Sequence, residues 1–172
     1  PILRYNGLLN SATNTNQLAP GTLASLYGLH LTSADAESAV RVTFNGLEAP
    51  LVAVSENQIN VQIPSAVQPG LAELRVFNGA ADSELMLVAI GRSAPGLFGV
   101  VSGKSVIASA GSPLEAGQIF KVIATGFGVS PVSLQEAVVL VNGIRLRPIS
   151  ATAPSPGIQE LTVTLPAALG SI

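Results

Sequence analysis

Short stretches in which apolar and polar residues alternate run along the whole chain. Alternation of this kind, rich in β-branched residues, predicts β-strands because successive side chains of a strand point to opposite faces. No stretch of eleven or more residues carries a helical period, and only residues 33–40 are expected to form a single turn. The clearest strand candidates are VRVTF (40–44), INVQI (59–63), AELRVF (72–77), IFKVIA (119–124), AVVLV (137–141) and LTVTL (161–165). The pattern predicts an all-β protein.

Four Asn-Gly pairs stand between or beside these stretches. They are Asn6-Gly7, Asn45-Gly46, Asn78-Gly79 and Asn142-Gly143. Both residue types tolerate the positive φ angles of a type I′ turn, whose twist matches that of two antiparallel strands. The pairs therefore predict tight hairpin turns.

The pattern also repeats along the chain. LAPGTLASLYGLHL, from Leu18, aligns with LEAGQIFKVIATGFG, from Leu114, and the later segments VTFNG and INVQIP align with VLVNG and LTVTLP. Short strands with turn signals at this spacing are typical of β-sandwiches. We predict two tandem sandwich domains, residues 1–91 and 92–172, joined by a short, stiff connection near residues 91–99 in which Phe98 packs between the domains.

The ordered segments LAPGTLASLYGLHL, FNGLEAPLVAVSENQINVQIP, APGLF, ATGFG and VNG carry a family resemblance. They resemble the tandem Ig-like modules of large secreted proteins of soil bacteria, which are similar to the IPT/TIG branch of Ig-like folds. The resemblance covers nearly the whole chain. It implies an Ig-like fold, an extracellular location and no enzymatic activity.

The second copy departs from that family pattern near its end. In the first copy Pro64 is followed by a strand, an Asn-Gly turn and a closing strand over residues 71–90, whereas Pro166 is followed only by AALGSI. We therefore expect a second sandwich that lacks its last strands, and hence an open sheet edge with unpaired N–H and C=O groups. A few hundred Å² of bare apolar surface would cost several kcal/mol at about 25 cal/mol per Å².

Two explanations of this gap stay open. The sequence is a fragment of a longer protein, or another subunit supplies the missing strand, as in donor-strand assembly. Residues 1–13 are a possible donor, although residues 8–13 fit better as the first strand of their own domain. The predicted contact between subunits involves residues of both chain ends: Pro1, Ile2, Leu3, Tyr5, Leu161, Val163, Leu165, Leu169 and Ile172.

Composition narrows the possible partners. Charged residues make up 10% of the 172 residues, against roughly 25% in an ordinary soluble domain, and the mean hydropathy is +0.51. Low charge and high hydropathy favour assembly into a head-to-tail homo-oligomer. The longest apolar run, LMLVAI, is far shorter than the ~20 residues of a membrane-spanning helix. A net charge of −2 argues against nucleic acid, and the absence of cysteine excludes disulfides.

Residues with catalytic or metal-binding chemistry are few. His30 is the only histidine, and its nearest acidic residue in sequence, Asp35, has no spacing typical of a catalytic pair. The TGFG segment (125–128) opens no helix and so indicates a strand-breaking bulge instead of a phosphate loop. Lys121 raises a weak hypothesis of a Lys–Asn isopeptide bond. We expect no cofactor, no metal and no enzymatic activity.

The function predicted from these features is an extracellular structural one. The chain is expected to be a self-associating Ig-like subunit of the bacterial cell surface, completed by donor-strand exchange within a filament. The alternative is a binding or adhesion module, glycan-binding in one form, or a spacer from a larger secreted protein. A cluster of solvent-facing aromatic or polar residues would favour that alternative.

Overall fold

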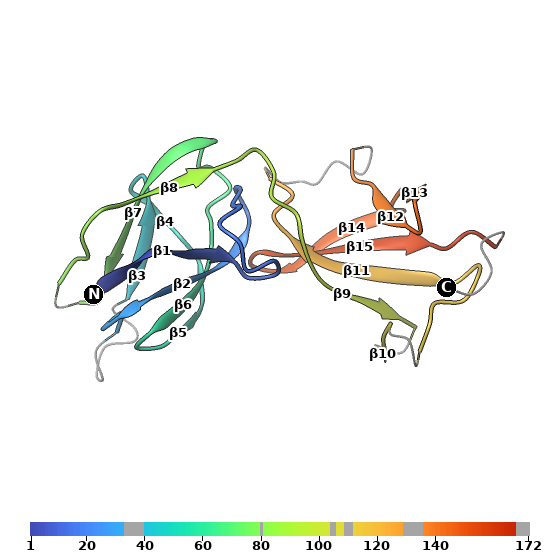
Figure 1. Ribbon diagram of the computed structural model, residues 1–172, viewed down its shortest axis with the longest axis horizontal. Coiled ribbons are helices and arrows are strands. Elements are labelled where there is room, and N and C mark those ends of the chain that lie inside the picture. Colours follow the sequence, from blue (N-terminus) through green and yellow to red (C-terminus); the bar gives the residue numbers. More distant parts are fainter. Residues whose placement is uncertain (33–39, 80, 104–105, 109–111, 129–135, 168–172) are drawn as a thin grey trace.

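A computed structural model shows a chain built from strands (Figure 1). The structure describes residues 1–32, 40–79, 81–103, 106–108, 112–128 and 136–167. Its strands are β1 (Ile2–Asn10), β2 (Leu23–Leu29), β3 (Arg41–Phe44), β4 (Leu47–Glu48), β5 (Leu51–Val54), β6 (Gln58–Gln62), β7 (Gly70–Phe77), β8 (Met86–Ile90), β9 (Gly96–Ser102), β10 (Val106–Ile107), β11 (Ile119–Thr125), β12 (Val139–Val141), β13 (Ile144–Leu146), β14 (Ser150–Ser155) and β15 (Ile158–Thr164). Among the described residues, no helix is long and apolar enough to cross a membrane.

The first half of the chain folds into two antiparallel four-stranded sheets. One has the order β1-β2-β6-β5 and the other the order β4-β3-β7-β8. Their inward side chains alternate along each strand, as in β7, where Ala72, Leu74 and Val76 are fully buried between exposed neighbours. Both sheets contribute to one core, in which Phe44 and Leu26 are among the largest fully buried side chains. This half is a closed sandwich.

The second half repeats the first sheet but not the second. Its large sheet has the order β10-β9-β11-β15-β14, so β9, β11, β15 and β14 take the places of β1, β2, β6 and β5. Facing it is a two-stranded sheet, β12-β13. The core of this half contains Phe120, Val122, Leu161 and Val163 from the large sheet and Leu146 from β13. Within the described part of the chain, no strands take the places of β7 and β8.

The Leu-x-x-Gly turn that precedes β2 and β11 makes the same backbone hydrogen bond in both halves. The N–H of Gly21 donates to the Ile63 carbonyl at 2.8 Å, and the N–H of Gly117 donates to the Leu165 carbonyl at 2.9 Å. Both glycines have positive φ angles, of 78° and 79°, a conformation that residues with a Cβ rarely adopt. The repeated Leu-x-x-Gly pattern therefore encodes the same turn twice.

The Asn-Gly predictions are confirmed at two of the four positions. Asn45-Gly46 and Asn142-Gly143 have φ pairs of 50°/77° and 48°/81° and join the hairpins β3–β4 and β12–β13. Asn6-Gly7 does not make a hairpin: it lies inside β1, at a shift of register between Leu3 and Leu8. Asn78-Gly79 begins a longer connection between β7 and β8, and only its glycine has a positive φ. A bulge and a long loop use the same dipeptide because both need a positive φ.

The predicted fold class is confirmed: the described chain is all-β, with antiparallel sheets stacked as in Ig-like sandwiches. All six strand candidates are found, each shifted by at most a few residues. The single turn expected at residues 33–40 lies outside the described residues except for Val40. The domain boundary between residues 91 and 92 stays a prediction, although the two buried clusters lie on either side of it.

Candidate functional site

The junction between the two halves is closely packed. The Ala94 carbonyl accepts a hydrogen bond from Asn10 Nδ2 at 2.9 Å, and the Ala94 N–H donates to the Gly126 carbonyl at 2.7 Å. The Leu23 N–H donates to Thr125 Oγ1 at 2.7 Å. Asn10, Ala94 and Thr125 are buried. Hydrogen bonds buried between the halves fix their relative orientation, because an unpaired buried polar group is costly.

Glycines allow this close approach. A Cβ on Gly126 would lie 3.1 Å from Thr22 Oγ1 of the first half, and a Cβ on Gly21 would lie 3.4 Å from the Gly128 carbonyl. At Gly157, a Cβ would lie 2.7 Å from the Cβ of Leu23. The TGFG segment therefore ends β11 as predicted, but it also forms the contact between the halves, which the sequence did not indicate.

Phe98 does not have the predicted role. Its side chain is 40% exposed, whereas Ala94 and Gly96 fill the junction. A Cβ on Gly96 would lie 2.7 Å from the Cβ of Ala12. Small residues take the place expected for an aromatic ring because the two backbones pass too close together.

The N-terminal residues of the predicted subunit contact lie at the start of β1. Ile2 and Leu3 pair with Leu29 and Gly28 of β2, so this segment belongs to its own sheet in the structure. Ile2 is 62% exposed and Tyr5 is 87% exposed, while Pro1 and Leu3 are half-buried. The predicted intersubunit contact of these residues stays a prediction.

The C-terminal residues of that predicted contact are placed differently. Leu161, Val163 and Leu165 are at most 1% exposed and belong to the core of the second half. Leu161 and Val163 belong to β15, which lies between β11 and β14 and is not an edge, and Leu165 follows it directly. Leu169 and Ile172 lie outside the described residues. As placed, the buried leucines and valine stabilise their own sheet, and any contact with another subunit would have to use a neighbouring edge.

A bulge in β1 shapes a cavity against β2. Between Leu3 and Leu8 the strand contains more residues than the facing stretch of β2, and Asn6 has a φ of 52°. A Cβ on Gly7 would lie 2.8 Å from the Tyr27 carbonyl. The bulge thereby turns Arg4 and Tyr5 outward, both of them exposed. Bulges of this kind re-aim side chains at the margin of a sheet.

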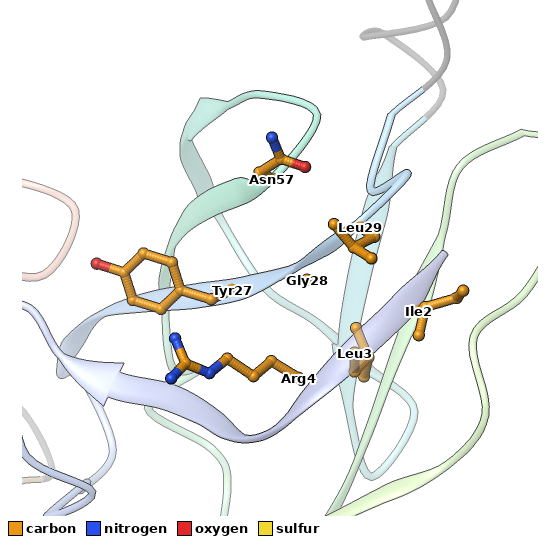
Figure 2. Close-up of a pocket in the computed structure, with 7 residues that line it drawn as sticks. All are labelled: Ile2, Leu3, Arg4, Tyr27, Gly28, Leu29 and Asn57. Atoms are coloured by element: carbon orange, nitrogen blue, oxygen red, sulfur yellow. The ribbon is translucent and has the colours of Figure 1, made fainter.

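The resulting cavity measures about 460 Å³ and contains one aromatic ring (Figure 2). Tyr27 and Arg4 reach in the same direction from β2 and β1, and Asn57, on the turn before β6, lies across β2 from Arg4. Leu29 and Ile2 line the other end. An aromatic face, a guanidinium and an amide provide stacking and hydrogen-bonding groups for a polar organic ligand.

A second cavity, of about 490 Å³, lies on the opposite side of the same segment. It is lined by Pro1, Leu3 and Tyr5 together with Leu85 and Met86 at the start of β8. The first five residues are thus flanked by open space on two sides. By contrast, Leu8 and Asn10, after the bulge, are buried.

Groups with catalytic potential do not converge in the described part of the chain. His30 Nδ1 lies 3.5 Å from Glu56 Oε1, and both side chains are exposed, while Asp35 lies outside the described residues. Among the described residues, no three His, Cys, Asp or Glu side chains form a group that could hold a metal ion. Lys121 Nζ meets Glu160 Oε1 at 2.8 Å, so its partner is a carboxylate and not the asparagine that an isopeptide bond requires.

Comparison with known proteins identifies the family of the chain. No curated protein matches. Two similar solved structures are that of the Bacteroides ovatus mixed-linkage glucan utilization locus SGBP-B with a mixed-linkage heptasaccharide (16% identity, TM-score 0.43) and a crystal structure with a xylogluco-oligosaccharide (17% identity, TM-score 0.40). The alignments cover 96% and 98% of this chain but only 36% of each of those chains. Residues 9–98, more than half of the sequence, match the IPT/TIG domain. The chain therefore belongs to the IPT/TIG family.

Proposed function

We propose that this chain is a non-enzymatic structural module of the bacterial cell exterior, in which two Ig-like units act as one rigid piece. The observation that carries the proposal is the junction, where the hydrogen bonds Asn10–Ala94 and Leu23–Thr125 and the close approaches at Gly96 and Gly157 join the halves. Connections between independent domains are usually exposed and make few contacts. A structural module needs a defined length and a defined direction between its two ends, and a rigid junction between the halves provides both.

The extracellular location and the self-association remain parts of the proposal. The location rests on the resemblance to modules of secreted proteins. Self-association in a filament completed by donor-strand exchange rests on the two-stranded sheet β12-β13, which faces a five-stranded one. Light scattering and electron microscopy of the purified chain test it: polymers support the filament, and a monodisperse monomer contradicts it.

Rigidity is directly measurable because the chain contains no cysteine. Spin labels at Ala53→Cys and Thr152→Cys, both exposed positions on opposite halves, would report one distance between the halves. We expect a single narrow distance distribution. A broad distribution that spans tens of ångströms would contradict the proposal.

A second candidate function is carbohydrate binding in the cavity beside Tyr27. Gln58 lies directly opposite Tyr27 on β6, and its amide bonds to Asn60 Oδ1 at 2.8 Å. Serine and asparagine side chains continue this polar row across the outer face of the sheet, with Ser25 Oγ donating to Asn60 Oδ1. Aromatic stacking beside hydroxyl and amide groups suits the two faces of a sugar ring.

Calorimetric titration with glucan oligosaccharides tests this second candidate. Such sugars are present in the two similar structures, but the candidate rests on the cavity alone. Tyr27→Ala should abolish measurable binding, because the ring would supply the stacking surface. Tyr5→Ala is the matched control, since Tyr5 lies outside this cavity and should leave the affinity unchanged. Absence of binding to the unmodified chain would remove the candidate.

A further inference from the structure

Arg4 carries a positive charge that no described residue neutralises. Among the described residues, its guanidinium forms neither an ion pair nor a hydrogen bond. Arg41, by contrast, lies over the ring of Phe77, 4.8 Å from the ring centroid. Arg4 is exposed and lines the cavity of about 460 Å³ beside Tyr27 (Figure 2). An unpaired guanidinium in the wall of a cavity is free to bind a ligand.

The charge around this cavity is positive. Arg4 is the only charged residue among the described residues that line it. Glu56, next to Asn57 in the sequence, does not line the cavity, and its Oε1 lies 3.5 Å from His30 Nδ1. The chain as a whole has a net charge of −2. A preference of the protein for an anionic ligand would therefore have to come from the cavity itself, because the net charge opposes it.

The ring of Tyr27 lies between this charge and an uncharged amide. On one side Arg4 reaches in the same direction as Tyr27 (Figure 2). On the other side Gln58 lies directly opposite Tyr27 on β6. Gln58 Nε2 donates to Asn60 Oδ1 at 2.8 Å, and within the described chain the carbonyl oxygen of the Gln58 side chain accepts no hydrogen bond. A ligand ring stacked on Tyr27 would meet a cation at one edge and a hydrogen-bond acceptor at the other.

A carboxylate fits this site better than a phosphate or a zwitterion does. One guanidinium matches one negative charge through two parallel N–H···O bonds. A phosphate monoester carries about two negative charges and would stay half neutralised. An amino acid would leave its ammonium group unpaired, because no carboxylate is present among the described lining residues. An aromatic ring beside side-chain amides suits a sugar ring, which presents apolar faces and hydroxyl groups at its edge.

We propose that the cavity beside Tyr27 binds a uronate residue of an acidic oligosaccharide. Arg4 holds the carboxylate, Tyr27 supports the ring, and the side-chain amides of Asn57 and Gln58 bond to hydroxyl groups. This inference deepens the carbohydrate-binding candidate and rests on it, since that candidate specifies no charge on the sugar.

Two ligands that share one backbone test the inference on the full chain. One is a neutral glucan oligosaccharide, and the other is the same oligosaccharide with its C6 hydroxymethyl groups oxidised to carboxylates. Calorimetric titration at low salt should give an affinity about fivefold or more higher for the oxidised form, the value of a good exposed ion pair. The difference should disappear near 1 M salt, where the screening length is about 3 Å.

Substitution of the arginine should remove the preference for the oxidised sugar. Arg4→Gln keeps a hydrogen-bonding amide but no charge, so the affinity for the oxidised form should fall about fivefold, to that of the neutral form. Arg4→Lys keeps the charge without the planar fork and should retain part of the preference. Arg75→Gln is the matched control. Arg75 is exposed on β7, in the other sheet, so this variant changes the net charge equally and should keep the full preference.

Equal affinities for the two sugars would overturn the inference and leave the carbohydrate-binding candidate in place. A preference that survives in Arg4→Gln, or one that Arg75→Gln also removes, would overturn it as well, because the charge would then act from elsewhere. Absence of binding of both sugars would remove the inference together with the candidate. The titration with the neutral sugar thus tests the candidate, and the ratio of the two affinities tests the inference, so the two failures are distinguishable.

Discussion

The two halves of this protein share one sheet and differ in the other. The sheet β1-β2-β6-β5 returns as β9-β11-β15-β14, with the same antiparallel order and the same hydrogen-bonded Leu-x-x-Gly entry. In the part of the chain that the structure describes, the facing sheet has four strands in the first half and two in the second. Consequently Phe44 is fully buried in β3, and Val141 at the corresponding place in β12 is half-buried. The comparison shows that the repeated sheet supplies one face of each core, while β7 and β8 help to cover the other face of the first core.

The largest difference should appear when the core-facing residue of the central hairpin is truncated in each half. Phe44→Ala removes a fully buried ring and should lower the free energy of unfolding of the first half by about 3–5 kcal/mol. Val141→Ala, at the matched position, should cost about 1 kcal/mol or less, because the side chain is only half-buried. Urea unfolding followed by circular dichroism measures both. Equal losses would mean that the second core is as closed as the first.

Substitution at the junction should come next. In Gly126→Ala, the new Cβ would overlap the Ala94 carbonyl at a residue with a positive φ. Because strain and overpacking act together, the substitution should lower the free energy of unfolding by about 2–5 kcal/mol. It should also broaden the distance distribution between the spin-labelled halves. Gly143→Ala is the matched control: its φ is 81°, against 80° at Gly126, but its Cβ would meet open space. That variant should cost only the strain, about 1–2 kcal/mol, and leave the distance unchanged.

Asn45, which bonds to Glu73, and its counterpart in the repeat, Asn142, give a smaller contrast. Asn45→Gly preserves the turn but removes the acceptor of the Glu73 N–H, and should cost about 1 kcal/mol. In the monomeric chain Asn142→Gly should have no measurable cost, since no described residue donates to that side chain. Thermal unfolding of the two variants at low protein concentration measures the difference. A loss of stability in Asn142→Gly under these conditions would reveal a partner within its own chain.

The smallest effect belongs to the polar pairs on the outer faces. Lys121 and Glu160 form an ion pair with side chains 52% and 22% exposed. In the first half Ser25 takes the place of Lys121 and donates to the uncharged Asn60. Lys121→Ala should cost about 0.2–1 kcal/mol at low salt. The cost should vanish near 1 M salt, where the screening length is about 3 Å. A cost that persists at high salt would show that packing of the lysine stem, and not charge, makes the contribution.

The candidate sites could be predicted only in part. The β12–β13 hairpin follows from the repeat, because VLVNG aligns with VTFNG, which forms the β3–β4 hairpin. The cavity beside Tyr27 could not be foreseen. It depends on a bulge at Asn6-Gly7, a pair that also makes hairpin turns, and on the approach of Arg4, Tyr27 and Asn57 from three separate segments. Leu161, Val163 and Leu165 were predicted to be apolar strand residues, but alternation does not indicate whether a strand lies at the centre or at the edge of its sheet.

Alternation, Asn-Gly pairs and a repeated glycine turn determined the strands, the all-β class and the tandem order, because these depend on local backbone preferences and on the period of the side chains. Tertiary structure decided which strand is central, which edge is open and how the halves meet. The junction depends on the close approach of Gly96 to Ala12 and of Gly157 to Leu23, residues that lie far apart in the chain. Contacts between distant segments produce no periodic pattern in the sequence, so they can be identified only in the folded structure.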